Sequence, residues 1–246
     1  MIQRLPFRAS RSLRAALLVI AGSAFAVGGC GSQDLDGGSR QSVFIRVALA
    51  PPAPQPAGSC VYGNDPNAPA LFRGTADLGL RDDYTMTVLV QSMDSRATTI
   101  SGVHVAVREP DGTLVREFEQ VVSGFVAAGA YGAVSFVAID APTTDAIRPA
   151  LPNRSVSRSI TVAATLRGTD PATGAAASSP EFLFPVQVCN GCLVDFSTGN
   201  DPTFSRQPNC LMPLTTGSRV PCALGQDEAT PCQLCQGREV CDPQTP

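Results

Sequence analysis

The sequence predicts a mainly β fold: an antiparallel immunoglobulin-like β-sandwich over residues 43–188, followed by an irregular, disulfide-rich C-terminal extension over residues 189–246. Three observations predict this class. Apolar side chains recur at every second position through residues 43–188, as they do in half-buried strands. No ten-residue stretch there has the 3.6-residue period of a helix. Seven of the nine cysteines follow residue 188, where apolar residues become sparse.

The period-two stretches delimit the expected strands one by one. In chain order they cover residues 43–49, 84–91, 102–109, 113–119, 121–126, 133–139, 160–167 and 182–188. Pro110, Asp111 and Gly112 form a tight-turn sequence, so 102–109 and 113–119 are predicted to pair as a hairpin. Residues 60–80 are expected to form a long loop.

The N-terminal residues have the pattern of an export signal. Residues 1–14 carry four arginines and no acid, and residues 15–27 are apolar apart from Ser23. This run is shorter than the roughly 20 residues that span a bilayer, but it fits the apolar region of a signal peptide. We therefore predict a signal peptide over residues 1–29. Residues 30–42, which are polar and glycine-rich after Cys30, are expected to be a flexible tether.

Val27-Gly28-Gly29-Cys30 resembles the lipobox of bacterial lipoprotein precursors. The resemblance implies that Cys30 is the lipidation site, that it becomes the first residue of the mature chain, and that fatty acyl chains such as palmitate hold the protein on a membrane. Gly31 follows the cysteine where lipoproteins of the inner membrane often have aspartate, so the outer membrane is favoured over the inner membrane. Two alternatives stay open: an ordinary cleaved signal peptide with an incidental thiol at Cys30, and an uncleaved membrane helix.

Composition and charge argue against several classes of function. The net charge is −3, and removal of residues 1–29 makes it more negative because they carry four arginines and no acid. Nucleic-acid binding therefore lacks its usual basic patch. His104 is the only histidine and lies on the polar face of a predicted strand, and no G-x-S-x-G elbow or phosphate-binding loop is present. We predict no enzyme activity, no catalytic residue, no cofactor and no metal.

The remaining cysteines are candidates for disulfides. An even number in an exported chain implies pairing, although sequence alone cannot choose among the 105 possible arrangements of eight. We expect Cys60 to join its loop to the C-terminal extension. The candidates are Cys60, Cys189, Cys192, Cys210, Cys222, Cys232, Cys235 and Cys241.

The spacing of the cysteines allows two other interpretations, a zinc site and a thiol oxidoreductase. Cys189/Cys192 and Cys232/Cys235 are both C-x-x-C pairs, and two such pairs can bind zinc, although about 40 residues is a long separation for such a site. Alternatively, Thr230 and Pro231 suit the N-cap and first position of a helix. A helix starting there would lower the pKa of the Cys232 thiol, as a thiol oxidoreductase requires.

The chain also resembles a group of cysteine-rich lipoproteins of the myxobacterial type. The residues that carry this resemblance are the lipobox, Leu80–Tyr84 with Thr87–Val90, Cys189–Leu193, and Pro221–Asp227 before Cys232–Cys235. The resemblance implies a lipoprotein and no particular activity. We therefore predict a lipid-anchored lipoprotein of the cell envelope that acts as a non-enzymatic binding or assembly module for an unknown protein or envelope partner. The alternative is a periplasmic thiol-disulfide oxidoreductase that uses the Cys232/Cys235 pair.

Overall fold

The computed structural model describes residues 40–52, 60–214 and 219–243. Most of its regular structure is β-strand, in agreement with the predicted class. The predicted signal peptide, the Cys30 lipidation site and residues 30–39 of the predicted tether lie outside the described residues. No helix within the described ranges has the length and apolar character needed to cross a bilayer.

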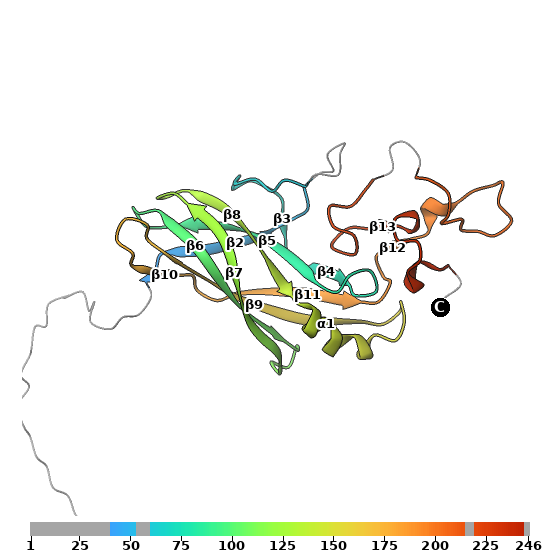
Figure 1. Cartoon of the computed structure of the whole chain (residues 1–246), viewed down its shortest axis with the longest axis horizontal. Coiled ribbons are helices and arrows are strands. Elements are labelled where there is room, and N and C mark those ends of the chain that lie inside the picture. The colour runs from blue at the N-terminus through green and yellow to red at the C-terminus, as the bar shows by residue number, and fades with distance from the viewer. Residues whose placement is uncertain (1–39, 53–59, 215–218, 244–246) are drawn as a thin grey trace, which may run out of the picture. The chain divides into compact units, whose positions relative to one another are not determined.

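Four strands form an antiparallel sheet (Figure 1). Their order across the sheet is β3 (Ala70–Leu71), β2 (Val43–Leu49), β5 (Tyr84–Ser92) and β8 (Tyr131–Ile139). The register of β5 against β8 shifts between Tyr84 and Thr85, which bends β5 at the end that the C-terminal residues contact.

Seven strands form a second sheet. Three long antiparallel strands are its centre: β7 (Leu114–Val126), β6 (Thr98–Arg108) and β9 (Ser157–Thr169). The other side of β9 carries β11 (Phe182–Cys189) along one half and β10 (Ala176–Ser178) along the other. Two short strands complete the sheet by parallel pairing, β4 (Gly74–Asp77) with β11 and β1 (Arg40–Gln41) with β10. The antiparallel prediction therefore holds for the long strands and not for these short edges.

One hydrophobic core is shared by the two sheets. On β9 the alternating residues Ile160, Val162, Ala164 and Leu166 are all fully buried. They pack with apolar residues of both sheets, which include Val88, Val90, Val103, Val105, Val107, Val134 and Phe184. Each Val or Leu side chain buried in this way contributes about 1.5–3 kcal/mol to folding. The period-two pattern thus identified the buried faces of the strands.

The predicted hairpin is confirmed. β6 pairs with β7 antiparallel, and Gly112 has a φ of +89° in the turn between them. A glycine there avoids the steric cost that a Cβ would bring in this left-handed conformation. β7 is one strand through Leu114–Val126, where the sequence pattern had shown two separate runs.

Several elements differ from the sequence prediction. β3 and β4 lie in the expected long loop, and β1 forms at the end of the expected tether. These strands were missed because they are short and lack alternating apolar residues; both residues of β1 are exposed.

α1 (Ala141–Ile147), followed by the 3₁₀ turn η1 (Arg148–Ala150), was also missed, since seven residues are too few to show a helical period. Asp140 caps α1 by accepting a hydrogen bond from the Thr143 N–H.

The C-terminal segment, residues 190–243, has little regular structure. Its elements are β12 (Val194–Asp195), η2 (Ser197–Gly199), β13 (Thr230–Pro231), η3 (Cys232–Leu234) and η4 (Glu239–Cys241). β12 and β13 pair in parallel through two residues each. The described residues from Arg40 to Pro243 belong to one compact unit, so the C-terminal segment folds against the β-rich region, the described part of residues 40–189.

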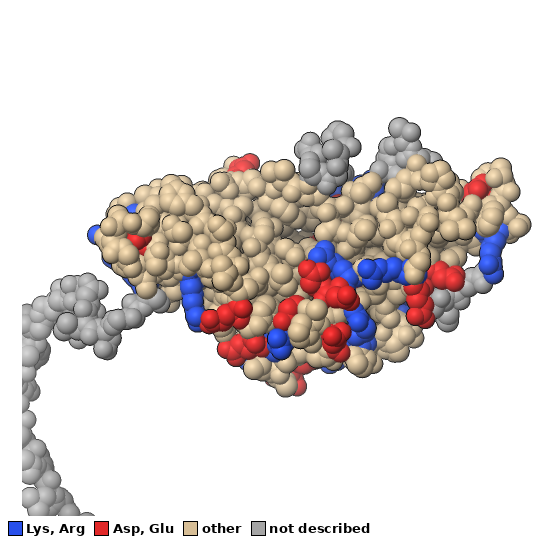
Figure 2. All heavy atoms as spheres, in the orientation of Figure 1, with Lys and Arg blue, Asp and Glu red and all other residues tan. Residues whose placement is uncertain are grey.

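Charged side chains of both signs gather in one area of the face drawn in Figure 2. Ion pairs among the described residues include Arg148 with Asp82 and Asp145, and Arg116 with Asp140. Exposed pairs of this kind contribute about 0–1 kcal/mol each. They neutralise the arginines locally and add little to stability.

Candidate functional site

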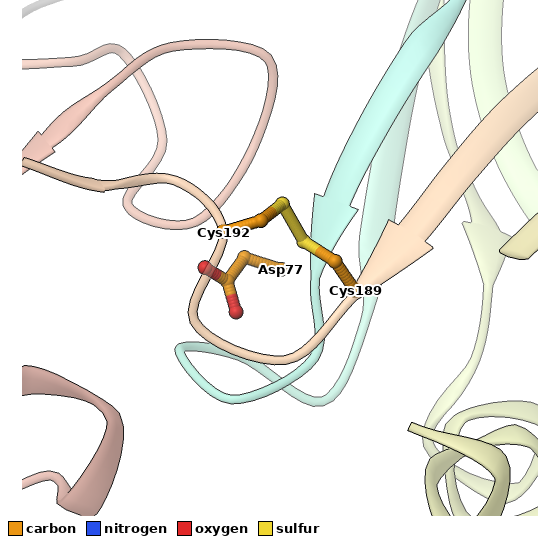
Figure 3. A group of neighbouring side chains, drawn as sticks. All are labelled: Asp77, Cys189 and Cys192. Carbon is orange, nitrogen blue, oxygen red and sulfur yellow. A yellow bond between two sulfur atoms is a disulfide. The ribbon is translucent and has the colours of Figure 1, made fainter. Parts of the chain in front are cut away.

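The candidate site is the Cys189-Asn190-Gly191-Cys192 loop together with the buried carboxylate of Asp77 (Figure 3). Two neighbouring strands bring these residues together. Asp77 ends β4 and Cys189 ends β11, and the parallel pairing of the two strands sets Asp77 directly opposite Cys189. One carboxylate oxygen of Asp77 and the two cysteine sulfurs lie within 4.8 Å of one another.

Asp77 holds the loop by hydrogen bonds to its backbone. Oδ1 accepts from the Gly191 N–H at 2.6 Å, and Oδ2 accepts from the Leu193 N–H at 2.9 Å. Oδ1 also accepts from the Gly79 N–H at 3.1 Å. Gly191 has a φ of +87°, which glycine adopts without strain, and a Cβ there would meet the Arg154 side chain at 2.8 Å. The loop therefore wraps around the carboxylate with a backbone that requires glycine.

The environment of Asp77 affects its ionisation in two opposing ways. Burial raises the pKa of the Asp77 carboxyl, because the charged form loses its hydration. The N–H groups of Gly191, Leu193 and Gly79 lower the pKa, because they donate to the charged form. Burial is the larger effect, so Asp77 takes up a proton more readily than an exposed aspartate.

Cys189 and Cys192 form a disulfide with each other. Cys189 is fully buried, whereas Cys192 is exposed. Sulfurs bonded in a disulfide are not thiolates, so the oxidised pair offers no thiolate ligands for the zinc interpretation. The chemistry that this arrangement supports is attack by an external thiolate on a disulfide that has one accessible end.

The other six cysteines among the described residues form three further disulfides: Cys60–Cys222, Cys210–Cys232 and Cys235–Cys241. The prediction that Cys60 joins its loop to the C-terminal residues is confirmed. The chain-entropy account assigns about 5 kcal/mol to the bridge between Cys60 and Cys222, which closes the longest loop, and about 2 kcal/mol to the Cys189–Cys192 bridge. The short bridge therefore contributes least to the fold.

Cys232 and Cys235, the pair of the predicted oxidoreductase, do not bond with each other. Each bonds with a different cysteine outside its C-x-x-C motif. The expected helix beginning at Thr230 is also not formed. Thr230 and Pro231 belong to β13, and only the three-residue turn η3 follows. The Thr230 side chain accepts a hydrogen bond from the Gly225 N–H instead of capping a helix.

A second polar cluster connects the C-terminal segment to the β-rich region through Gln226 and Asp227. The Gln226 side chain accepts from the Thr85 N–H at 3.0 Å and donates to the Thr85 carbonyl, so it continues the pairing of β5 like one residue of a strand. Asp227 accepts from the Thr75 N–H at 2.7 Å and from the Tyr84 hydroxyl at 3.0 Å. Burial raises the pKa of Asp227 to about 6, against the opposing effect of the Thr75 N–H.

His104 lies on β6 and its Nε2 is 2.6 Å from the Glu117 carboxylate of β7. This pair is formed across the hairpin on the face turned away from the core, consistent with the polar position predicted for His104. Neither member contacts the Cys189–Cys192 loop in the hydrogen bonds described. His104 is therefore not part of the candidate site.

Sequence reasoning missed Asp77, Gln226 and Asp227. Asp77 follows Thr75 and Ala76 in a segment without alternating apolar residues, so nothing marked it as the end of a buried strand. Its relation to Cys189 depends on a parallel strand pairing between residues more than 100 positions apart. The C-x-x-C motif was the only local signal, and it occurs twice.

Comparisons with known proteins add little to this site. No family model matches the chain, and no curated protein matches it. Among solved structures, it is similar to a protein from Archaeoglobus fulgidus, with 14% identity, 42% of this chain and 82% of that chain covered, and a TM-score of 0.31. It is also similar to AT1g01470 from Arabidopsis thaliana, with 12% identity, 46% and 72% covered, and a TM-score of 0.29. At these TM-scores, neither likeness carries an inference about fold or function.

Proposed function

We propose that this protein is a lipid-anchored lipoprotein of the cell envelope whose folded region is a non-enzymatic binding or assembly module. The observation that carries the proposal is the partition of the nine cysteines. The eight that follow Cys30 bond with one another, which leaves none of them for Cys30. Acylation requires an exported chain with a cysteine that is available in a lipobox. Cys30, the cysteine outside these four disulfides, lies in such a sequence.

The anchor part of the proposal rests on residues 1–39. Cleavage before Cys30 and acylation of its thiol would attach the mature chain to a membrane by more than one acyl chain, which gives stable anchoring. Gly31 favours the outer membrane. The polar residues 31–39 would then separate the lipid from β1, the first strand of the folded region.

The β-rich region supplies the binding part of the proposal. An immunoglobulin-like sandwich is the finer assignment that we propose for its two sheets, supported by their shared core. The seven-stranded sheet presents exposed apolar side chains on long strands: Val121 is 91% exposed, and Phe125 and Leu183 are also exposed. Contact with a partner on this sheet would remove the apolar surface of these side chains from water, which is favourable.

Substitution of the lipobox cysteine tests the anchor. The Cys30→Ala variant should leave the detergent phase in a phase-separation assay, or should accumulate as the uncleaved precursor, because its acyl acceptor is gone. The Ser32→Ala variant is the matched control and should behave as the native chain does. Unchanged partitioning of processed Cys30→Ala into detergent would refute the lipid anchor.

A further inference from the structure

We propose that the Cys189–Cys192 disulfide is a thiol-disulfide exchange site that oxidises the dithiol of a partner molecule, with Cys192 as the sulfur that is attacked. The Cys189–Cys192 pair differs from the other bonded cysteines in three ways. It is the C-x-x-C pair that closes on itself. Cys192 is exposed, whereas the other seven bonded cysteines are buried or half-buried. A buried carboxylate lies next to both sulfurs.

Accessibility decides which sulfur reacts. Cys189 has no exposed surface, so a thiolate from solvent reaches only the Cys192 end of the bond. Displacement at Cys192 makes Cys189 the leaving group. The leaving sulfur then lies inside the protein, beside Asp77.

The exchange balances without any further reagent. The partner thiolate forms a bond to Cys192 Sγ, the Cys189–Cys192 bond breaks, and its electron pair goes to Cys189 Sγ, which takes a proton from the Asp77 carboxyl. The second thiol of the partner then gives its proton to water, attacks the partner sulfur of the mixed disulfide and forms the partner's disulfide bond, while the Asp77 carboxylate regains a proton from the solvent. Cys192 leaves as a thiolate and is protonated by water. The partner dithiol becomes a disulfide, and Cys189 and Cys192 become thiols.

Asp77 suits this role by position and by ionisation. One of its carboxylate oxygens lies within 4.8 Å of both sulfurs, and burial raises its pKa so that the carboxyl has a proton to give more often than an exposed acid. Its bonds to Gly191 and Leu193 come from the backbone and do not involve the sulfurs. The loop therefore keeps its attachment to the β-rich region when the disulfide opens.

Graded reduction of the folded full-length chain tests the proposal directly. The protein is incubated with increasing concentrations of dithiothreitol without denaturant, free thiols are alkylated, and the modified cysteines are identified by mass spectrometry. We expect Cys189 and Cys192 to be reduced at a dithiothreitol concentration about tenfold or more below that needed for the other bridges, a difference of about 30 mV in potential. Simultaneous opening of all bridges, or earlier opening of another, would overturn the proposal.

Single substitutions test which sulfur is attacked. Cys189→Ser leaves an exposed thiol at Cys192 and should form a mixed disulfide with oxidised glutathione. Cys192→Ser leaves the buried Cys189 thiol and should react about tenfold or more slowly, because access controls the rate. Equal rates, or the reverse order, would contradict the assignment of Cys192. The reduction experiment on the native chain stands independently of whether these variants fold.

The Asp77→Asn variant tests the proton transfer. Asparagine retains an oxygen acceptor for the Gly191 N–H but cannot exchange a proton. The reduction rate is divided by the thiolate fraction of dithiothreitol to correct for the pH dependence of the reagent. In the native chain, this corrected rate should fall with rising pH as Asp77 ionises. In Asp77→Asn, the corrected rate should be independent of pH. A folded Asp77→Asn variant with the native pH profile would exclude Asp77 as the proton donor.

Discussion

The β-rich region and the C-terminal segment are stabilised in different ways. In the β-rich region, apolar side chains from two sheets form one core, and the residues of this core all lie between Val43 and Val188. Among the described residues, the C-terminal segment contributes to a small cluster in which Cys235 and Cys241 pack with Leu80. Disulfides and hydrogen bonds hold the rest of its described residues. Stability in the first region is therefore spread over many contacts, whereas in the second it depends on a few specific pairings.

Removal of the longest-range bridge should have the largest effect. The Cys60→Ala/Cys222→Ala variant should lose up to about 5 kcal/mol of unfolding free energy in denaturant titration, because the unfolded chain regains the freedom that this bridge removes. The matched control, Cys235→Ala/Cys241→Ala, closes a much shorter loop and should lose about 2 kcal/mol. Equal losses in the two variants would contradict the ranking by loop length.

A core substitution should have the next largest effect on the unfolding free energy and should distinguish the two regions. Leu166 is fully buried on β9, and Leu166→Ala should lower the unfolding free energy by about 2–5 kcal/mol through lost burial and the cavity left behind. Leu211 in the C-terminal segment is 76% exposed, so Leu211→Ala should change the unfolding free energy by less than about 0.5 kcal/mol. A comparable loss at Leu211 would show that the C-terminal segment has an apolar core of its own.

The bond between Gln226 and the backbone of β5 should make a smaller contribution. Gln226→Ala leaves the Thr85 N–H and carbonyl without these partners, which should cost about 1–3 kcal/mol. Amide hydrogen exchange reports the change at Thr85 itself. Its amide should exchange faster in Gln226→Ala, and the amides at the centre of β9 should keep their native protection. Native protection at Thr85 would mean that Gln226 does not hold the C-terminal segment in place.

The last expected effect is a pH dependence of the unfolding free energy that comes from Asp227. Its pKa rises from 3.8 to about 6 in the folded state, so the folded chain binds more protons than the unfolded chain between these values. The contribution of Asp227 to stability is therefore fully present below about pH 4 and is lost as the pH rises through about 6. Asp227→Asn should remove this loss, which is about 3 kcal/mol for the full shift, and flatten the stability curve from pH 4 to pH 7. An unchanged curve would contradict the assignment.

The same contrast explains what could be predicted from the sequence. Burial of alternate side chains on a strand is a local property, so the long strands and the hairpin at Gly112 could be found from spacing alone. The edge strand β4 and its Asp77 depend on pairing with β11, far along the chain, and no local pattern encodes that. The partners of the cysteines are likewise set by the folded chain. Spacing left the 105 arrangements of the eight cysteines open, and the fold pairs Cys232 with Cys210.

The intact mass of the mature protein, isolated from membranes and measured before and after reduction, tests the central claim most directly. The account predicts a chain that begins at an acylated Cys30, contains no alkylatable thiol, and gains eight hydrogens when its four disulfides are reduced. A chain that begins at Met1, carries no acyl group and has free thiols among Cys60–Cys241 would contradict it.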